Sequence, residues 1–160
     1  MGCDIHPYVE KYNSERGWYL LGPTVAHHVH MRNRGDLSLS KPDIEIINGV
    51  FTYAKSYFPF LDRNYKLFEV LAGVRGDSTV AHHLPRGVPS GCSEEYAYEV
   101  SQWDSDGHSH SWYYLEELID IYWGRDAESC VQFITEFIPY LKYHAHGDYS
   151  SIRFCFFFDN

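Results

Sequence analysis

The chain has 160 residues, of which 44% are hydrophobic and 18% aromatic. This is enough apolar material for one packed core, so a disordered chain is excluded. Its formal net charge of −9 at neutral pH makes general binding to DNA or to anionic lipid unfavourable.

No apolar run approaches the roughly 18 to 20 residues that a membrane span needs, and no basic region precedes an apolar stretch near residue 1. The four cysteines are widely spaced and include no Cys-x-x-Cys pair, which favours reduced thiols over a zinc ribbon. We therefore expect one cytoplasmic globular domain covering residues 1–160, with no membrane partner.

The first part of the chain predicts a β-hairpin. Residues 4–12 alternate between apolar and polar, a polar turn follows at 13–17, and an apolar run resumes at 18–21. Residues 22–56 are interrupted by proline and glycine, so we expect loops there, with short strands near 44–54.

The middle of the chain predicts a helix and then a loop. Asp62 is placed to cap the helix, which carries apolar residues on one side, and Gly73 stands where a left-handed residue would end it. Residues 74–91 are rich in glycine, proline and arginine, a composition that favours a long ordered loop.

Further helices are expected in the second half. Ser93 and the two acids after it predict a helix that finishes near Trp103. Ser111 is interpreted as the cap of the next helix, which should end at Gly124.

The end of the chain predicts a kinked helix and a strand. A helical pattern opens at Asp126, and Pro139 must kink or split it. The aromatic run at 153–160 predicts a buried strand. Terminal strands with helices between them indicate an α+β domain, in which the N-terminal hairpin and the C-terminal strand form a small, mainly antiparallel sheet that packs with three or four helices.

Two short segments carry the residues best suited to chemistry. Residues 106–112 read Asp-Gly-His-Ser-His-Ser-Trp, and in an extended segment His108 and His110 would point to the same side. Asp4 and His6 would likewise share one face of the first strand. The predicted sheet would bring them near Asp159, and the His108 segment can reach the same end.

These residues predict a metal centre. Asp4, His6, His108 and His110 are candidate ligands of a divalent transition metal such as zinc or manganese, since imidazole and carboxylate suit these ions. A metal-bound hydroxide could then attack a phosphoester, with His108 and His110 as the catalytic residues. The alternative is that the two segments lie far apart, one on a solvent-facing strand and the other in a loop before a helix.

A second hypothesis needs no metal. Arg63, Arg75 and Arg86, together with His108 and His110, could bind a phosphate, because guanidinium groups match phosphate oxygens. Tyrosine or tryptophan rings could stack against a base. The alternative is that these arginines pair with some of the 22 acidic residues.

Several motifs together resemble a family of short uncharacterised proteins of tailed phages and prophages. They are Met-Gly-Cys-Asp-Ile-His at 1–6, Asp-Arg-Asn-Tyr at 62–65, Arg-Gly-Val-Pro at 86–89, the 106–112 segment and Phe-Asp-Asn at 158–160. The chain departs from the family at Val88, where leucine is usual, and around Tyr113 and Tyr114, where a threonine is common. The resemblance implies a protein made in an infected bacterium. It also points to one shared polar pocket, made of Asp4, His6, Asp62, Arg63, Arg86, His108 and His110.

Two classes of function follow. An enzyme would hydrolyse or transfer a phosphorylated or nucleotide-like substrate, with a bound ion or with one histidine as general acid or base. A non-catalytic counter-defence protein would instead sequester a nucleotide signal or bind a host protein.

Overall fold

Segments from the two ends of the chain form the middle of one antiparallel sheet. The computed structural model describes residues 2–22, 44–47, 50–53 and 61–160. Within these ranges the larger sheet has the strand order β2, β1, β6, β5. Its strands are β1 (Ile5–Asn13), β2 (Gly17–Gly22), β5 (Gly107–Tyr114) and β6 (Ile152–Asp159). The predicted α+β class, with the N-terminal hairpin and the C-terminal strand in one sheet, is confirmed.

Strand β6 is central because it has side chains to bury on both faces. All of its residues except the last are buried. Phe154, Phe156 and Phe158 belong to a large apolar cluster, whereas Cys155 and Phe157 belong to a smaller one. Alternate residues of a strand point to opposite faces, so the two clusters lie on opposite sides of the sheet.

A second, smaller strand pair lies apart from this sheet. Strands β3 (Ile44–Ile47) and β4 (Val50–Tyr53) pair antiparallel, as the sequence predicts for residues 44–54. The loops expected elsewhere between 22 and 56 fall largely at 23–43, 48–49 and 54–60, which lie outside the described residues.

Helix α2 (Tyr65–Ala72) is capped by Asn64 and not by Asp62. The Oδ1 atom of Asn64 accepts a hydrogen bond from the amide of Leu67 at 3.2 Å. Asp62 is too far upstream to reach the free amides of the first turn. The predicted end is confirmed, since Gly73 adopts a left-handed φ of 70°.

Helix α3 (Glu94–Trp103) has the predicted start and end. The Ser93 hydroxyl accepts a hydrogen bond from the amide of Tyr96 at 3.2 Å. Acids in its first turn face the positive end of the helix dipole, which favours a helix at this place.

Helix α4 (Leu115–Asp120) is shorter than the sequence predicts. Ser111 does not cap it, because Ser111 lies within β5, where it pairs with Phe156 of β6. The helix also ends before Gly124. Pairing with the central strand therefore overrides the local capping signal at Ser111.

Helix α5 (Ile138–Ala145) follows a π-helical turn at Phe133–Phe137. Residues 131–145 form one continuous helical run, so Pro139 does not split it. The run widens to π-helical geometry just before Pro139, and the helical pattern that the sequence opens at Asp126 begins later, after a turn.

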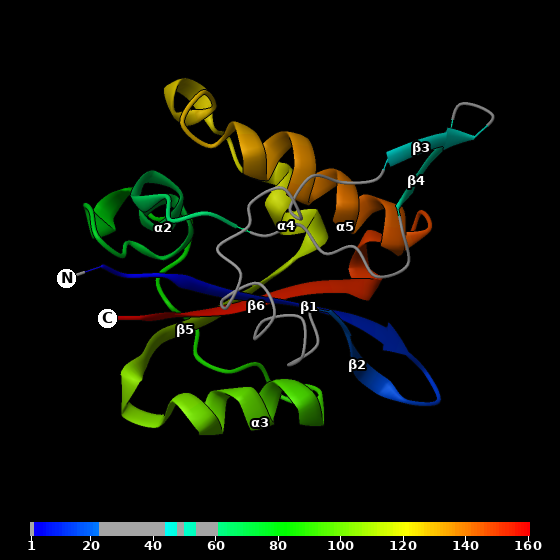
Figure 1. Cartoon of the computed structure of the whole chain (residues 1–160), viewed down its shortest axis with the longest axis horizontal. Coiled ribbons are helices and arrows are strands. Elements are labelled where there is room, and N and C mark those ends of the chain that lie inside the picture. The colour runs from blue at the N-terminus through cyan, green and yellow to red at the C-terminus, as the bar shows by residue number, and fades with distance from the viewer. Residues whose placement is uncertain (1, 23–43, 48–49, 54–60) are drawn as a thin grey trace.

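The helices cover the two faces of the sheet unequally (Figure 1). Helix α3 lies on one face, and α2, α4 and α5 lie on the other. The two ends of the chain lie side by side at one end of the sheet. Of the helices in the described ranges, none has the length and apolar character that crossing a bilayer requires.

Candidate functional site

Polar side chains from three strands meet at the end of the sheet where the chain termini lie. The main-chain N–H of Asp159 donates to the carbonyl of Asp4 at 3.1 Å. In return, the N–H of Asp4 donates to Oδ1 of the Asp159 carboxylate at 2.9 Å. Pairing of the first and last strands therefore brings Asp4 and His6 to Asp159, as the sequence predicts.

Asp159 and His6 form a hydrogen-bonded pair. The Oδ2 atom of Asp159 lies 2.9 Å from Nε2 of His6, and the two side chains are only 16% and 11% exposed. The other carboxylate oxygen is held by the amide of Asp4, so the carboxylate cannot rotate freely. A carboxylate fixed in this way orients the imidazole and provides a counter-charge for its protonated form.

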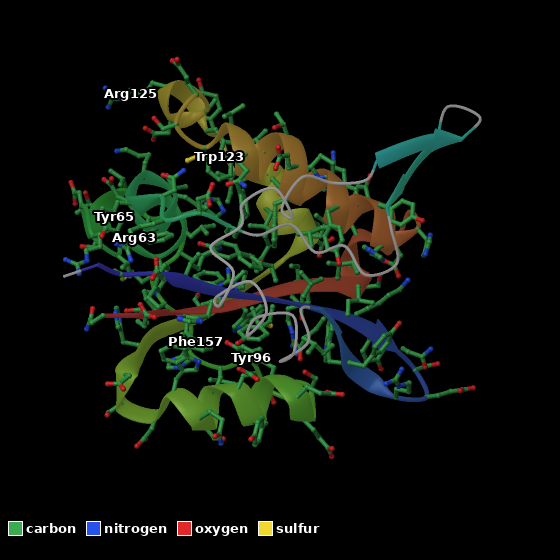
Figure 2. All side chains as sticks on the ribbon, viewed as in Figure 1. Arg63, Tyr65, Tyr96, Trp123, Arg125 and Phe157 are labelled. Carbon is green, nitrogen blue, oxygen red and sulfur yellow. The ribbon has the colours of Figure 1, made fainter. Side chains whose placement is uncertain are left out.

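Arg63 extends this network to the surface. Its Nε and one terminal nitrogen donate to the two carboxylate oxygens of Asp4, each at 2.9 Å. The guanidinium lies directly over Gly2, where a Cβ atom would overlap it. The bidentate pair raises the pKa of Arg63. Figure 2 shows Arg63 beside the first strand, at the end where the chain begins.

Cys3 and Arg75 lie next to this network. Cys3 is fully buried, and burial raises the pKa of its thiol although a hydrogen bond with Arg75 opposes this. Arg75 is exposed and lies 5.7 Å from the ring centre of Tyr65. A buried neutral thiol is a packing group more than a nucleophile.

A β-bulge separates the two histidines of β5, which the sequence predicts to share one face. The register with β6 shifts between His108 and Ser111, and Ser109 has a left-handed φ of 52°. His108 therefore pairs with Phe158, whereas His110 stacks against Phe157. These phenylalanines belong to opposite faces of the sheet, so the prediction of a common side is wrong.

The bulge places His110 on the same face as His6. The two imidazoles both stack on Phe157, with ring centres 5.1 Å from it for His110 and 4.9 Å for His6. Trp103, the last residue of α3, packs against His6, and the centres of the two rings are 4.2 Å apart. Figure 2 shows Phe157 between the sheet and α3.

His110 and His6 differ in their surroundings. The Nε2 atom of His110 is buried and has no hydrogen-bond partner among the described residues. Burial, with a smaller effect from His108, lowers the pKa of His110. Burial of this kind favours the neutral form of an imidazole.

His108 lies at the exposed rim of the site. Its Nε2 atom is 3.1 Å from Oδ1 of Asn160, and its Nδ1 atom is 3.0 Å from the hydroxyl of Ser109. Across the part of the chain that the structure describes, no three His, Cys, Asp or Glu side chains are grouped so that they could hold a metal ion.

Arg86 is paired away from this network. Its guanidinium makes a bidentate pair with Glu117 of α4 at 3.0 and 3.1 Å and lies 4.7 Å from the ring centre of Trp112. Its main-chain N–H donates to the hydroxyl of Ser111. Arg86 therefore pairs with an acidic residue, which is the alternative that the sequence leaves open for these arginines. Asp62 is exposed beside Arg63.

The sequence did not single out Trp103, Phe157 or Asn160 for this site. In the sequence, Trp103 and Phe157 look like ordinary aromatic residues of a core. Only the structure shows that they lie beside histidines of the site. Asn160 directly follows Asp159. This position at the end of the last strand is the sequence feature that could have identified Asn160 as part of the site.

No protein-family model, curated protein sequence or solved structure matches this chain. The geometry of the residues is therefore the basis for assigning a function.

Proposed function

We propose that the chain binds a phosphorylated or nucleotide-like ligand at this end of the sheet and cleaves its phosphoester bond with His6 as the proton carrier. The observation that carries the proposal is the Asp159 carboxylate, which is fixed by the Asp4 amide and bonded to His6. A general acid or base needs this kind of fixed orientation.

The charge near His6 suits an anion. Arg63 pairs with Asp4, and Arg75 forms a hydrogen bond with Cys3. Guanidinium groups bind phosphate oxygens in pairs. Because the side chain of Arg63 is about half exposed (48%), it can exchange its carboxylate partner for a phosphate without a large burial cost.

A sequestering protein is the second candidate, and the position of Trp103 favours it. Its ring packs on His6, with ring centres 4.2 Å apart, and aromatic rings of this kind stack against nucleotide bases. The resemblance to tailed-phage and prophage proteins suggests a setting, the cytosol of an infected bacterium, and suggests a host defence nucleotide or a host protein as the partner.

The experiment combines binding and turnover. Adenosine 5′-monophosphate binding would be followed by NMR, and hydrolysis of bis(p-nitrophenyl) phosphate by absorbance, after metal removal and again with added Zn²⁺ or Mn²⁺. We expect His6→Asn to lower kcat by about 10²–10⁴-fold and Asp159→Asn to lower it less. His146→Gln, an exposed histidine, is the matched control.

The outcomes separate the candidates. Turnover that depends on His6 supports the enzyme, and dependence on an added ion assigns it to a metal-assisted reaction. Binding of the nucleotide without turnover by any preparation supports sequestration. Absence of binding together with absence of turnover would overturn both.

A further inference from the structure

We infer that an aromatic patch on the α3 face of the sheet binds an arginine-bearing segment of a partner protein. The aromatic patch consists of Tyr12, Trp18, Trp112 and Tyr114. It lies toward the hairpin end of the sheet, away from the His6 network, so the inference does not depend on the proposed function.

The strand register places the four rings on one face. Tyr12 of β1 pairs with Trp18 of β2. Tyr114 of β5 pairs with Arg153 of β6, which in turn pairs with Glu10 of β1. Residues that pair directly lie on the same face of a sheet, as do residues two apart along one strand. The aromatic patch therefore lies on the face that also carries α3.

The rings of the aromatic patch form a continuous row. Their centres are 5.4 Å apart for Tyr12 and Trp18, 6.1 Å for Trp18 and Tyr114, and 5.2 Å for Tyr114 and Trp112. Because the rings hold one another in place, a partner does not have to order them on binding. Ordered tryptophan and tyrosine side chains are typical of the centre of a protein interface. A row of four rings also suits several side chains of a protein segment better than one small cation.

The aromatic patch is the accessible half of this face. Tyr12 is 49% exposed, and the other three rings are partly exposed. The aromatic side chains beneath α3 are buried instead: Tyr8, Tyr96 and Phe157. Figure 1 shows α3 extending from the side of β2 toward the end of the sheet where the chain termini lie. A partner can therefore reach the four rings without displacing α3.

The rings already bind guanidinium groups of the chain itself. The guanidinium of Arg153 lies 4.1 Å from the ring centre of Trp18, and that of Arg86 lies 4.7 Å from the ring centre of Trp112. Each of these arginines is largely buried and pairs with a glutamate. The two cations are therefore engaged, and they do not provide a site for an anionic ligand.

The charge beside the aromatic patch favours a cationic partner. Between Arg86 and Arg125 the chain contains eight acidic residues and no lysine or arginine. Glu94 and Glu95 are exposed in the first turn of α3, directly after the residue whose amide bonds to the Glu10 carboxylate. Arginine side chains of a partner can stack on the exposed rings and pair with these two acids. The same acids oppose a nucleic acid, although aromatic rings can stack against its bases.

The test titrates the ¹⁵N-labelled full chain with a hexa-arginine peptide and follows the indole N–H resonances by NMR. We expect the resonances of Trp18 and Trp112 to shift until they saturate. The resonance of Trp123 should not move, because this residue packs against the apolar cluster on the other face. A deoxythymidine hexanucleotide should leave Trp18 and Trp112 unshifted.

Variants test the rings and the acids separately. Tyr12→Ala should weaken binding of hexa-arginine about 2–5-fold, because one exposed cation–π contact is lost. Glu94→Gln combined with Glu95→Gln should weaken it about 2–10-fold. The matched controls remove an exposed ring or two exposed acids in and after α4, and they should keep the wild-type affinity: Tyr122→Ala, and Asp120→Asn with Glu128→Gln.

Three outcomes would overturn the inference. Equal weakening by the variants and their controls, or a Trp123 shift as large as that of Trp18, would show attraction to the net charge alone. Stronger shifts of Trp18 and Trp112 with the hexanucleotide than with the peptide would assign the aromatic patch to nucleic acid. Shifts that appear when the protein alone is concentrated would assign it to a contact between two copies of the chain.

Discussion

At the scale of single residues, the first six positions form a linked set. Gly2 leaves room for the Arg63 guanidinium, Cys3 is buried, and Asp4 pairs with Arg63. Asp4 is joined in turn through Asp159 to the His6 imidazole.

Gly2→Ala should displace Arg63. The new Cβ atom would overlap the guanidinium, so the bidentate contact with Asp4 should be lost. We expect the Arg63 Nε–H resonance to shift and to exchange faster with solvent, with little change in melting temperature because the ion pair is exposed. In an Arg63→Ala background, Gly2→Ala should have no further effect on stability; an additional loss there would contradict this role of Gly2.

His144 should make the fold sensitive to acid. Burial lowers its pKa from the ordinary 6.5 to about 4. Between these values the unfolded chain binds a proton that the folded chain does not, so stability is present above pH 6.5 and is lost as pH falls through about 4. The slope per group has an upper limit of about 1.4 kcal/mol per pH unit, which solvent screening reduces because the ring is partly exposed.

The measurement is the free energy of unfolding by urea from pH 7 to 4. His144→Gln should flatten the slope, and the remaining slope should come in part from His83 and His110, whose pKa values burial also lowers. His82→Gln, at an exposed position, removes only a minor charge effect on His83 and should change the slope much less. A wild-type slope in His144→Gln would contradict the prediction.

At the scale of elements, a buried ion pair joins two strands and a helix. Glu10 of β1 and Arg153 of β6 are 0% and 3% exposed, and they pair at 2.7 Å. The other carboxylate oxygen of Glu10 accepts from the amide of Ser93, which caps α3. The guanidinium also lies 4.1 Å from the ring centre of Trp18 of β2. The pair thereby fixes where α3 docks on the sheet.

Removal of one partner of this ion pair should lower the free energy of unfolding far more than removal of both charges. Arg153→Met leaves a buried carboxylate without a counter-ion, so we expect a loss of about 3–5 kcal/mol in the free energy of unfolding. The double variant Glu10→Gln with Arg153→Met should recover a large part of this loss. Equal destabilisation of the single and the double variant, measured by denaturant titration, would rule out the charge as the cause.

At the scale of the whole molecule, the last strand completes the sheet. Strand β6 pairs with both β1 and β5, which are far apart in the sequence. It also contributes side chains to both apolar clusters. Pairings between such distant segments slow folding, because the entropy of loop closure opposes them before their contacts form. The site depends on the same pairing, since it combines the first and last residues of the sheet.

Deletion of residues 152–160 should therefore abolish cooperative folding, because β1 and β5 would lose their common neighbour. Deletion of Asn160 alone should keep the fold and remove only the partner of His108 Nε2. Thermal unfolding followed by circular dichroism distinguishes these results. A cooperative transition in the longer deletion would show that β6 is dispensable.

Most of the secondary structure is readable from local patterns. The alternation of 4–12, the Ser93 cap and the glycine after α2 each act over a few residues, so their effect does not depend on the rest of the fold. The errors occur where distant contacts compete with such signals. Ser111 has a capping side chain, but pairing with β6 holds it in a strand.

The sequence by itself determined the α+β class and the proximity of Asp4 and His6 to Asp159. The periodicity of its apolar residues indicates the strands, and the strands near the two ends of the chain indicate which segments pair. Only the tertiary structure decided which histidines share a face. The bulge at Ser109 arises where β5 adjusts its register to β6, and one extra residue in a strand exchanges the faces of the side chains beyond it. Spacing along the chain does not reveal that exchange, since it depends on the partner strand.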